Sequence, residues 1–439
     1  ISGPQAEAIL EALVPDWPAD QPSHKLRLSR IHDTGGNLID ESLAVLMRAP
    51  QTYTGEDVVE FQCHGGPIIL RRLLDATLEA GARTAEPGEF TQRAFLNGRI
   101  DLTQAEAVAD LVNATSEKAH QMALEHLQGR LGEDIQTQLE RVTEALTLVE
   151  AAIDFSHEEH VYQIESDEIF ERLDAALDEL RRLEAQFDRG RRQREGIRVV
   201  ILGRTNAGKS TLFNALHGTE RAIVTPVAGT TRDYLEEELH LGGVALRVID
   251  TAGLRQTTDE VEEIGIERSR ELKQKADLVI WVVDRHEGLS EREREELDEL
   301  AATASEETAS IIVINKSDLD DALTADDHRF LGQFDHSVET CFAEKRTEGV
   351  DELTDTIEAI GEKLTSGEGV LLSRARHLEC VRQAVESLER ASEAIEQEME
   401  HEFVAVDLRD ALDALGEIVG NVSTDDILGR IFSEFCVGK

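Results

Sequence analysis

The stretch IRVVILGRTNAGKSTLFNALHG, residues 197–218, decides the fold of the middle of this chain. Its first part is a continuous apolar, β-branched run, which is typical of a strand buried on both faces of a sheet. Gly203–Ser210 then matches the pattern GxxxxGK[ST], and a helical stretch follows directly. In such a strand–loop–helix, the backbone N–H groups of the glycine-rich loop wrap a phosphate at the helix N-terminus. The stretch therefore predicts a nucleotide-binding site.

Three further apolar runs repeat this strand pattern: VALRVID at residues 244–250, ADLVIWVVD at 276–284 and ASIIVIN at 309–315. Buried strands separated by helical stretches predict a parallel sheet with helices on both faces, the α/β class. On either side of this segment, apolar residues recur at helical spacing. We therefore expect a multidomain protein, with an α/β P-loop domain at residues 195–363 inserted into an all-α domain made of residues 103–194 and 364–439. Four consecutive domains are the alternative.

Residues 1–102 have a mixed pattern that predicts a small α+β domain. DVVEFQCHGG reads as a strand followed by a glycine turn, and PIILRRLLDATLEAG reads as a helix that Gly81 closes. Thr103 and Glu106 have the spacing of a capping box, which predicts the start of the long helical region. The chain begins with Ile1 rather than Met, so we expect the first strand of this domain to lie upstream of it.

The composition is strongly acidic. Among 439 residues, 45 are Lys or Arg and 90 are Asp or Glu, which gives a formal net charge of -45. This charge disfavours non-specific binding of nucleic acid, because basic side chains supply that affinity. We interpret it as an adaptation to a high-salt cytoplasm, and an acidic protein that avoids nucleic acid is the alternative. The 4 cysteines contain no CxxC pair, and no apolar run is long enough to span a membrane, so we expect a protein of the reducing cytoplasm.

A second and a third motif concern the base and the terminal phosphate. Asn315–Asp318 follows an apolar run and fits the pattern NKxD, in which the carboxylate of Asp318 would accept both hydrogens of guanine's Watson–Crick edge. Adenine does not offer these hydrogens, and a polar site left unpaired discriminates strongly. Asp250–Gly253 fits DxxG, where Asp250 would hold magnesium through water and the Gly253 N–H would sense the γ-phosphate. The three motifs together predict a GTPase.

Magnesium needs further oxygen ligands around the phosphates. Ser210 follows Lys209, which would contact the terminal phosphates, and Thr231 in the loop AIVTPVAGTTRD is the natural second ligand. The full set of expected GTP-binding residues is Asn206, Ala207, Gly208, Lys209, Ser210, Thr211, Thr225, Pro226, Val227, Ala228, Gly229, Thr230, Thr231, Asp250, Thr251, Ala252, Gly253, Asn315, Lys316, Ser317 and Asp318.

Leu254 stands where many GTPases carry the glutamine that orients the attacking water, and an apolar side chain cannot do so. A polar group farther along RQTTDEVEEIGIE, or a group from a partner, must replace that glutamine. Arg255 is one candidate for stabilising the developing charge. A bound cation would serve as well if the P-loop offered it oxygen ligands, and the amide of Asn206 is such a ligand.

These features together resemble the MnmE (TrmE) family of tRNA-modification GTPases. The resemblance rests on Asn206 in the P-loop, TPVAGTT, DTAGL followed by DEVEEIGIER, AEPGEFTQRAFLNGRIDLTQAEAVADL and the terminal FCVGK, and it covers nearly the whole chain. It implies that potassium binds Asn206, Thr225, Val227 and Thr230 when two GTPase domains of a homodimer meet. It also implies that Glu262 acts on the attacking water through another water. A solvent-exposed carboxylate on a helix is the alternative interpretation of Glu262.

The resemblance further implies a reaction. Family members work with a flavoprotein partner to add a carboxymethylaminomethyl or aminomethyl group to C5 of the wobble uridine of tRNA, and the carbon comes from a methylene-folate. The family's ligands for 5-formyl- or methylene-tetrahydrofolate correspond to Glu60, Arg99 and Lys439 here, with residues 1–102 as the folate-binding dimerisation domain. For Glu60 and Arg99 the alternative is a surface ion pair. The terminal DILGRIFSEFCVGK has apolar residues at helical spacing, so we expect its helix to pack in the helical domain and deliver Lys439 to the folate site.

Two other classes of GTPase compete with this interpretation. A ribosome-assembly GTPase shares the P-loop and potassium chemistry but usually carries a basic RNA-binding domain, which the sequence does not contain. A membrane-linked signalling GTPase is disfavoured because no basic amphipathic helix is visible. One departure concerns the base: Ala343-Glu344-Lys345 stands where such GTPases usually carry Ser-Ala-Lys. We therefore expect guanine selectivity to rest mainly on Asn315, Lys316 and Asp318.

Overall fold

The computed structural model describes residues 1–154, 166–218, 236–249, 272–302, 308–343, 346–367, 369–422, 425–433, 435 and 438. The chain forms two compact units. The first comprises residues 1–113, 123–181 and 379–439, and the second comprises residues 114–122 and 182–378. Helices that precede and follow the middle of the chain in sequence therefore belong to the same unit.

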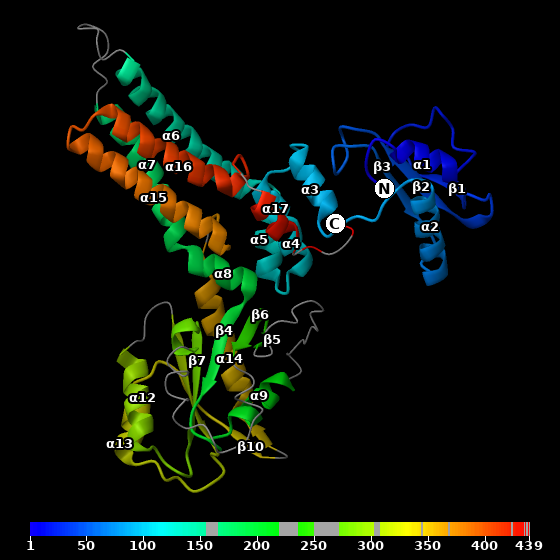
Figure 1. Ribbon diagram of the computed structural model, residues 1–439. Helices are drawn as coiled ribbons and strands as arrows, with labels where there is room; N and C mark the ends of the chain where they lie inside the picture. Colours follow the sequence, from blue (N-terminus) through cyan, green and yellow to red (C-terminus); the bar gives the residue numbers. More distant parts are fainter. Residues whose placement is uncertain are drawn as a thin grey trace. The chain divides into compact units, whose positions relative to one another are not determined.

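The first unit begins with an antiparallel sheet of three strands in chain order, β1 (Arg27–His32), β2 (Leu38–Met47) and β3 (Val58–Gln62). Helices α1 (Ala6–Leu13) and α2 (Pro67–Glu79) cover one face of this sheet (Figure 1). Their contact is apolar, because alternate strand residues and one stripe of each helix form a single buried cluster that includes Leu10, Leu13, Ile31, Leu46, Val59 and Leu73. This part of the chain is an α+β fold.

The start of helix α4 (Leu102–Asn113) differs from the prediction. The carboxylate of Asp101 accepts hydrogen bonds from the N–H of Gln104 at 2.9 Å and from the hydroxyl of Thr103 at 2.6 Å. The side chain of Gln104 in turn accepts from the N–H of Asp101 at 3.0 Å. The predicted capping box of Thr103 and Glu106 is therefore wrong. Asp101 and Gln104 form the reciprocal pair instead, while Thr103 and Glu106 are each only 2% exposed.

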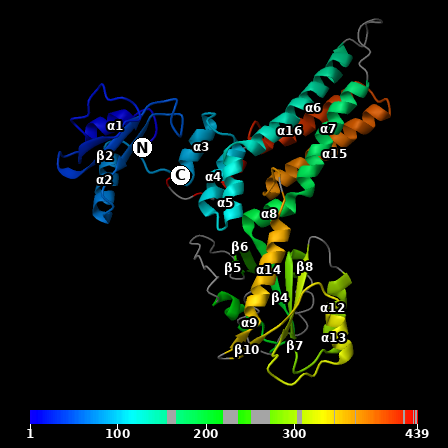
Figure 2. The ribbon, with the colours of Figure 1, turned by 180° about the vertical axis from the view of Figure 1, so that it is seen from behind.

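Long amphipathic helices make up most of the rest of the first unit. After α5 (Glu117–Leu127), four helices lie side by side (Figures 1 and 2): α6 (Arg130–Asp154), α7 (Ser166–Ala185), α15 (Ala375–Glu396) and α16 (His401–Val419). Helix α16 buries Val404, Leu408, Ala411 and Leu415, the spacing of one helix face. Among the described residues, no helix is both long and apolar enough to cross a membrane.

The last helix, α17 (Asp425–Ser433), packs against the start of the helical region. Leu428, Ile431 and Phe432 form one buried cluster with Leu102 and Ala105 of α4. The chain approaches it closely just before α3 (Glu89–Leu96): a Cβ on Gly88 would lie 2.8 Å from the carbonyl oxygen of Phe432. The predicted packing of the terminal helix in the helical region is confirmed, while Lys439 lies outside the described residues.

The second unit contains a six-stranded sheet in the order β5-β6-β4-β7-β8-β9. The strands are β5 (Glu236–Leu241), β6 (Val244–Ile249), β4 (Ile197–Leu202), β7 (Leu278–Asp284), β8 (Ala309–Asn315) and β9 (Ser337–Glu339). All neighbours pair in parallel except β5, which pairs antiparallel with β6. The sheet is thus mixed rather than wholly parallel, because the two-residue turn Gly242–Gly243, with φ of 54° and 88°, returns the chain directly.

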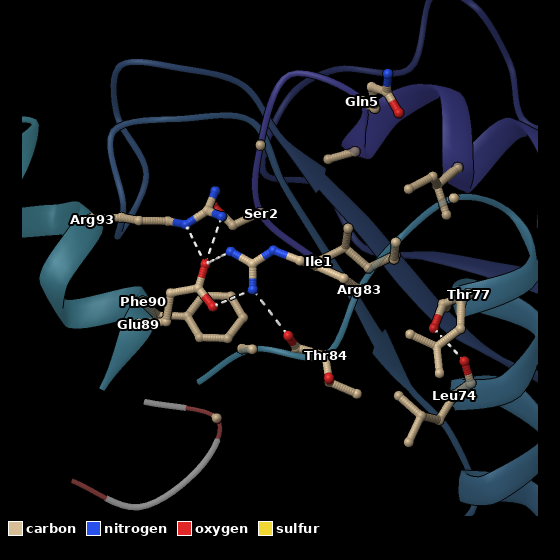
Figure 3. Close-up of a pocket in the computed structure, with 18 of the residues that line it drawn as sticks. Ile1, Ser2, Gln5, Leu74, Thr77, Arg83, Thr84, Glu89, Phe90 and Arg93 are labelled. Carbon is tan, nitrogen blue, oxygen red and sulfur yellow. Dashed lines mark hydrogen bonds and ion pairs between the residues drawn. The ribbon is translucent and has the colours of Figure 1, made fainter. Parts of the chain in front are cut away.

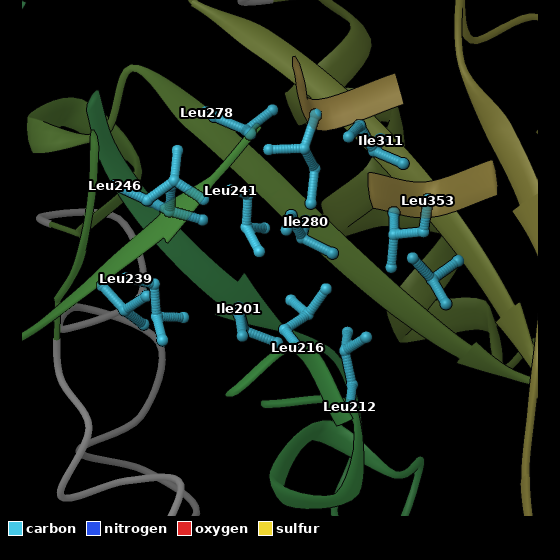
Figure 4. Packing of buried hydrophobic residues seen from close by; sticks show 14 of the residues in the cluster. Ile201, Leu212, Leu216, Leu239, Leu241, Leu246, Leu278, Ile280, Ile311 and Leu353 are labelled. Atoms are coloured by element: carbon cyan, nitrogen blue, oxygen red, sulfur yellow. The ribbon is translucent and has the colours of Figure 1, made fainter. Parts of the chain in front are cut away.

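Helices cover both faces of this sheet, as the sequence predicts. On one face, α9 (Lys209–His217) and α14 (Val350–Thr365) pack over Val199 and Ile201, and Figure 4 shows this cluster. On the other face, α12 (Glu291–Ala302) and α13 (Ala325–Leu331) pack over Val200 and Leu202. Successive residues of β4 therefore face opposite layers. A short ribbon of β10 (Cys341–Ala343) and β11 (Arg346–Glu348) precedes α14.

The amino ends of β4, β7 and β8 are held by Asp277. Its carboxylate accepts from Arg191 at 2.6 Å and from Arg192 at 2.8 Å, both on α8 (Phe187–Glu195). Burial alone would raise the pKa of Asp277, but the hydrogen bonds from the two arginines lower it below the usual value. On the same helix, a Cβ on Gly190 would lie 2.0 Å from the carbonyl oxygen of Leu372. The segments near the beginning and the end of residues 182–378, at Gly190 and Leu372, are therefore in contact.

Candidate functional site

The site is built at the carboxyl ends of β4 and β8, which meet at one edge of the sheet. Between β4 and α9 the chain makes a tight loop that only glycine permits at two positions. Gly203 has a φ of 133°, and a Cβ there would lie 2.2 Å from the carbonyl oxygen of Val282. Gly208 has a φ of 107°, and a Cβ there would lie 2.1 Å from the side-chain nitrogen of Asn315. Gly203 therefore packs against backbone and Gly208 against the Asn315 side chain, which leaves the N–H groups at the start of α9 as an anion site.

Asn315 joins this loop to the NKSD segment. Its Nδ2 donates to the carbonyl oxygen of Ala207 at 2.8 Å, and its Oδ1 accepts from the hydroxyl of Thr340 at 3.3 Å. Asn315 is 3% exposed, so these bonds are made in the interior. The Asn315 side chain thus positions the phosphate loop, whereas the sequence predicted that it contributes to guanine selectivity. Sequence reasoning missed Thr340, which follows β9 and whose carbonyl oxygen accepts from the N–H of Ser317 at 3.1 Å.

The other three residues of the NKSD segment have different surroundings. Lys316 has a φ of 63° and its ammonium lies 2.5 Å from a carboxylate oxygen of Asp284, which ends β7 and is buried. The charge of Lys316 is therefore compensated within the protein. The side chain of Asp318 is exposed, and its carboxylate is accessible to a base. Ser317 is half-buried and held through its backbone to Thr340.

Lys209 is the cation of the phosphate loop. Its ammonium donates to the carbonyl oxygens of Gly203 at 2.7 Å and of Arg204 at 2.6 Å, so it spans the mouth of the loop. Burial lowers the pKa of Lys209, and the nearby carboxylate of Glu293 opposes that shift. Ser210 is half-buried and Thr211 is exposed in the first turn of α9, and the buried Ala207 precedes Gly208. Asn206 has a φ of 67° and is exposed at the surface of the loop.

The two described candidates for the folate site lie in the α+β part. Glu60 is on β3, opposite Val45, and is exposed. Arg99 follows α3, is also exposed, and its Nε donates to the carbonyl oxygen of Thr52 at 3.1 Å. Among the described residues, no hydrogen bond or ion pair joins Glu60 to Arg99. The two side chains are therefore not paired with each other.

A cavity of about 510 Å³ lies in the same part of the chain, between α1, α2 and α3. Its wall carries an ion-pair network, in which Figure 3 shows Glu89 between the guanidinium groups of Arg83 and Arg93. The hydrogen bond from Arg83 is the main cause that lowers the pKa of Glu89 to about 2. Neither Glu60 nor Arg99 lines this cavity. The two described folate candidates therefore lie outside this cavity.

Comparison with known proteins assigns the chain to a family. Residues 102–436 match the model of the MnmE helical domain, and residues 1–99 match that of the GTP-binding protein TrmE N-terminus. The chain belongs to the MnmE family. The tRNA modification GTPase MnmE of Syntrophotalea carbinolica is 45% identical over 427 residues, which cover 95% of this chain and 90% of that protein. The tRNA modification GTPase MnmE of Aquifex aeolicus is 42% identical over 411 residues, which cover 93% and 89%.

Among solved structures, Era in complex with MgGDPNP and nucleotides 1506–1542 of 16S ribosomal RNA matches 44% of this chain and 66% of its own, at 23% identity. Its TM-score of 0.29 is too low to support a structural argument.

Many residues that the MnmE resemblance implicates lie outside the described part of the chain. These are the catalytic candidates Glu262 and Arg255, the potassium ligands Thr225, Val227 and Thr230, the magnesium ligand Thr231, the remaining loop residues Pro226, Ala228 and Gly229, the DxxG residues Asp250, Thr251, Ala252 and Gly253, and Lys439. Their roles stay predictions. The structure does bring together the other two nucleotide motifs, at Asn206–Thr211 and at Asn315–Asp318.

Proposed function

We propose that this chain is a GTP hydrolase that acts in the modification of tRNA. The observation that carries the proposal is the bond from buried Asn315 to Ala207, which makes the phosphate loop and the guanine-reading segment one site. The proposal is also supported by membership of the MnmE family, whose curated relatives are named tRNA modification GTPases. We further infer that the GTPase domain, residues 195–363, is inserted into a helical domain of residues 103–194 and 364–439.

Each described motif has a role in binding GTP. The N–H groups at the start of α9 and the ammonium of Lys209 receive the phosphates, because both are positive and point at the loop. The exposed carboxylate of Asp318 accepts from guanine, while Lys316 stays paired with Asp284. The hydroxyl of Ser210, in the first turn of α9, fits the role of a magnesium ligand together with Thr231. When bound, magnesium neutralises charge on the β- and γ-phosphates.

Hydrolysis requires a substitute for the absent glutamine and arginine finger. We propose that Asn206, Thr225, Val227 and Thr230 hold potassium beside the phosphates, and that Glu262 orients the attacking water. The exposed position of Asn206 supports this proposal, since its amide is accessible to a cation beside the loop. A potassium ion there supplies the positive charge that an arginine finger supplies elsewhere. Arg255 is the second candidate.

The tRNA chemistry involves the remaining parts of the chain. We propose a homodimer that works with a flavoprotein partner to place a carboxymethylaminomethyl or aminomethyl group on C5 of the wobble uridine. The carbon donor is a methylene-folate, held by Glu60, Arg99 and Lys439. A carboxylate suits the pterin's amino and ring N–H groups, and cations suit the glutamyl carboxylates. Both Glu60 and Arg99 are exposed, so each is accessible to a ligand.

The GTPase part of the proposal is tested by hydrolysis in potassium and in sodium at equal ionic strength. We expect the rate to be far higher in potassium, and Asn206→Ala to remove most of that difference. Glu262→Ala should retain GTP binding and lose turnover, so that kcat falls while nucleotide affinity changes little. Equal rates in the two salts would refute the cation. Near-normal turnover of Glu262→Ala would return the catalytic role to Arg255 or to a partner.

The modification part needs a separate assay. The full chain, a flavoprotein partner, methylene-tetrahydrofolate, GTP and unmodified tRNA are incubated together, and the wobble nucleoside is identified by mass spectrometry. We expect the modified uridine only when GTP and the folate are both present. Potassium-dependent hydrolysis without any modified nucleoside would favour a ribosome-assembly switch instead.

A further inference from the structure

Glu293 is a buried carboxylate beside the phosphate loop that the proposed mechanism does not use. It lies in the first turn of α12 and is 4% exposed. Its Oε2 accepts from the N–H of Ser290 at 3.3 Å and from the hydroxyl of Ser290 at 3.1 Å, which is a capping box. Its Oε1 is buried and has no hydrogen-bond partner among the described residues. A helix cap needs no such buried, half-satisfied charge, because a cap works as well in solvent.

The surroundings of Glu293 connect it to the cation of the nucleotide site. Its Oε2 lies 3.6 Å from the guanidinium of Arg204, which also lies 3.4 Å from Glu287. The backbone carbonyl of the same Arg204 accepts from the ammonium of Lys209 at 2.6 Å. One loop residue thus contacts Glu293 with its side chain and Lys209 with its main chain. Glu293 also interacts electrostatically with Lys209.

The charged side chains around Arg204 are, taken together, unfavourable to a bound polyanion. Arg204 is opposed by Glu287 and Glu293, and Glu296 on the same helix adds further negative charge near Glu293. Lys209 reaches the end of the loop formed by Gly203 and Arg204, and in P-loops this lysine meets the terminal phosphates. The buried charge of Glu293 therefore lies on the side of the loop where Lys209 would meet the terminal phosphates. A buried charge is screened less than a surface charge.

We propose that Glu293 sets the balance of affinity between guanosine triphosphate and diphosphate, by holding a buried negative charge behind the end of the P-loop that receives the terminal phosphate. This inference rests on the proposed function, because it presumes that the loop binds a guanine nucleotide. The carboxylate repels the additional charge of the triphosphate more than it repels the diphosphate. The site is thereby prevented from holding its substrate too tightly relative to its product.

The test compares Glu293→Gln with the wild type in the full chain, with magnesium present and at fixed ionic strength. A fluorescent GDP and a non-hydrolysable GTP analogue are titrated separately. Glutamine keeps the size of the side chain and an oxygen that can accept from Ser290, but it removes the charge. We expect the affinity for the GTP analogue to rise roughly three- to tenfold, the scale of a partly screened interaction with one unit charge, and the affinity for GDP to rise less.

Three further variants separate this effect from a structural one. Glu291→Gln removes an exposed carboxylate from the same helix turn and should leave both affinities within about twofold of the wild type. Ser290→Ala breaks the cap without changing charge and should leave the ratio of the two affinities unchanged. Glu293→Asp keeps the charge and should keep a ratio close to that of the wild type. A larger rise in affinity for the GTP analogue than for GDP in Glu293→Gln would support the proposal.

Equal changes for both nucleotides, or a loss of both, would refute it and leave Glu293 as a brace for Arg204. Absence of nucleotide binding by the wild type would instead refute the proposed function.

Discussion

Replacing Asn315 by alanine should weaken nucleotide binding without changing which base is preferred. The mutation removes the donor to the carbonyl oxygen of Ala207, at 2.8 Å, and the acceptor for the hydroxyl of Thr340, at 3.3 Å. A buried carbonyl left without its donor costs about 1–3 kcal/mol. If the loop escapes this cost by leaving its binding-competent shape, the apparent affinity falls by about 5- to 150-fold. Thr340→Val removes only the longer bond and should cost less, about 0.5–1.5 kcal/mol.

The assay is competition of GDP and inosine diphosphate against a fluorescent nucleotide. Inosine lacks the 2-amino group that Asp318 is proposed to bind. Asn315→Ala should therefore weaken both ligands by the same factor, whereas Asp318→Asn should reduce the preference for GDP over inosine diphosphate. The reasoning fails if Asn315→Ala binds GDP within twofold of the wild type, because the loop would then hold its shape unaided. It also fails if that variant loses base preference, because Asn315 would then read the base itself.

Three further predictions concern other parts of the molecule. The pKa of Glu89, about 2 in the folded chain against 4.5 for an ordinary glutamate, means that its contribution is complete above pH about 5 and is lost as the pH falls toward 2. Glu89→Gln should therefore have a free energy of unfolding lower by about 1–3 kcal/mol at pH 7 and equal to that of the wild type near pH 2. The fluorescence of Trp17, in a Trp281→Phe background, reports this unfolding. A difference that persists in acid would contradict the ion-pair network. Gly190→Ala should lower the unfolding midpoint of the second unit, because its Cβ would lie 2.0 Å from a backbone oxygen. The fluorescence of Trp281, in a Trp17→Phe background, measures this midpoint. An unchanged midpoint would show that helix α8 shifts to make room. Deleting residues 436–439 should weaken folate binding by about 1.5–3 kcal/mol and spare GTP hydrolysis, as calorimetry beside a GTPase assay would show; unchanged folate affinity would refute the placement of Lys439.

Local motifs predicted the phosphate loop, the NKSD segment and the buried strands, because each depends on neighbours in sequence. The errors and omissions arise where a residue outside the motif makes the contact. Thr103 and Glu106 have the residue types and spacing of a capping box. Asp101 lies two residues earlier, however, and its carboxylate caps the helix instead. The contact of Thr340 with Asn315 was not predicted either, because the pairing of β9 with β8 creates it and no local pattern contains it.

The site was predicted less completely than the fold for a physical reason. Glycines and a lysine in a fixed pattern indicate where phosphate binds, because the backbone conformation of the loop requires glycine at those positions. Glu293 reaches the same loop from a helix almost 90 residues farther along the chain, and its sequence context is that of an ordinary cap. Its role follows only from burial and from the contact with Arg204. The lining of the large cavity likewise combines three helices that no motif connects.

The close approach of Gly190 to Leu372 bears on the proposed insertion of residues 195–363 into the helical domain. When the two ends of an inserted domain are in contact, the domain can be placed between two consecutive helices without moving those helices apart. The entropic cost of closing a loop rises by only about 0.6 kcal/mol for each doubling of its length. Here the contact between α8 and Leu372 brings the two ends together, whatever the number of residues between them. Insertions within this unit would therefore leave its junction unchanged, whereas a single methyl group at Gly190 would disturb it.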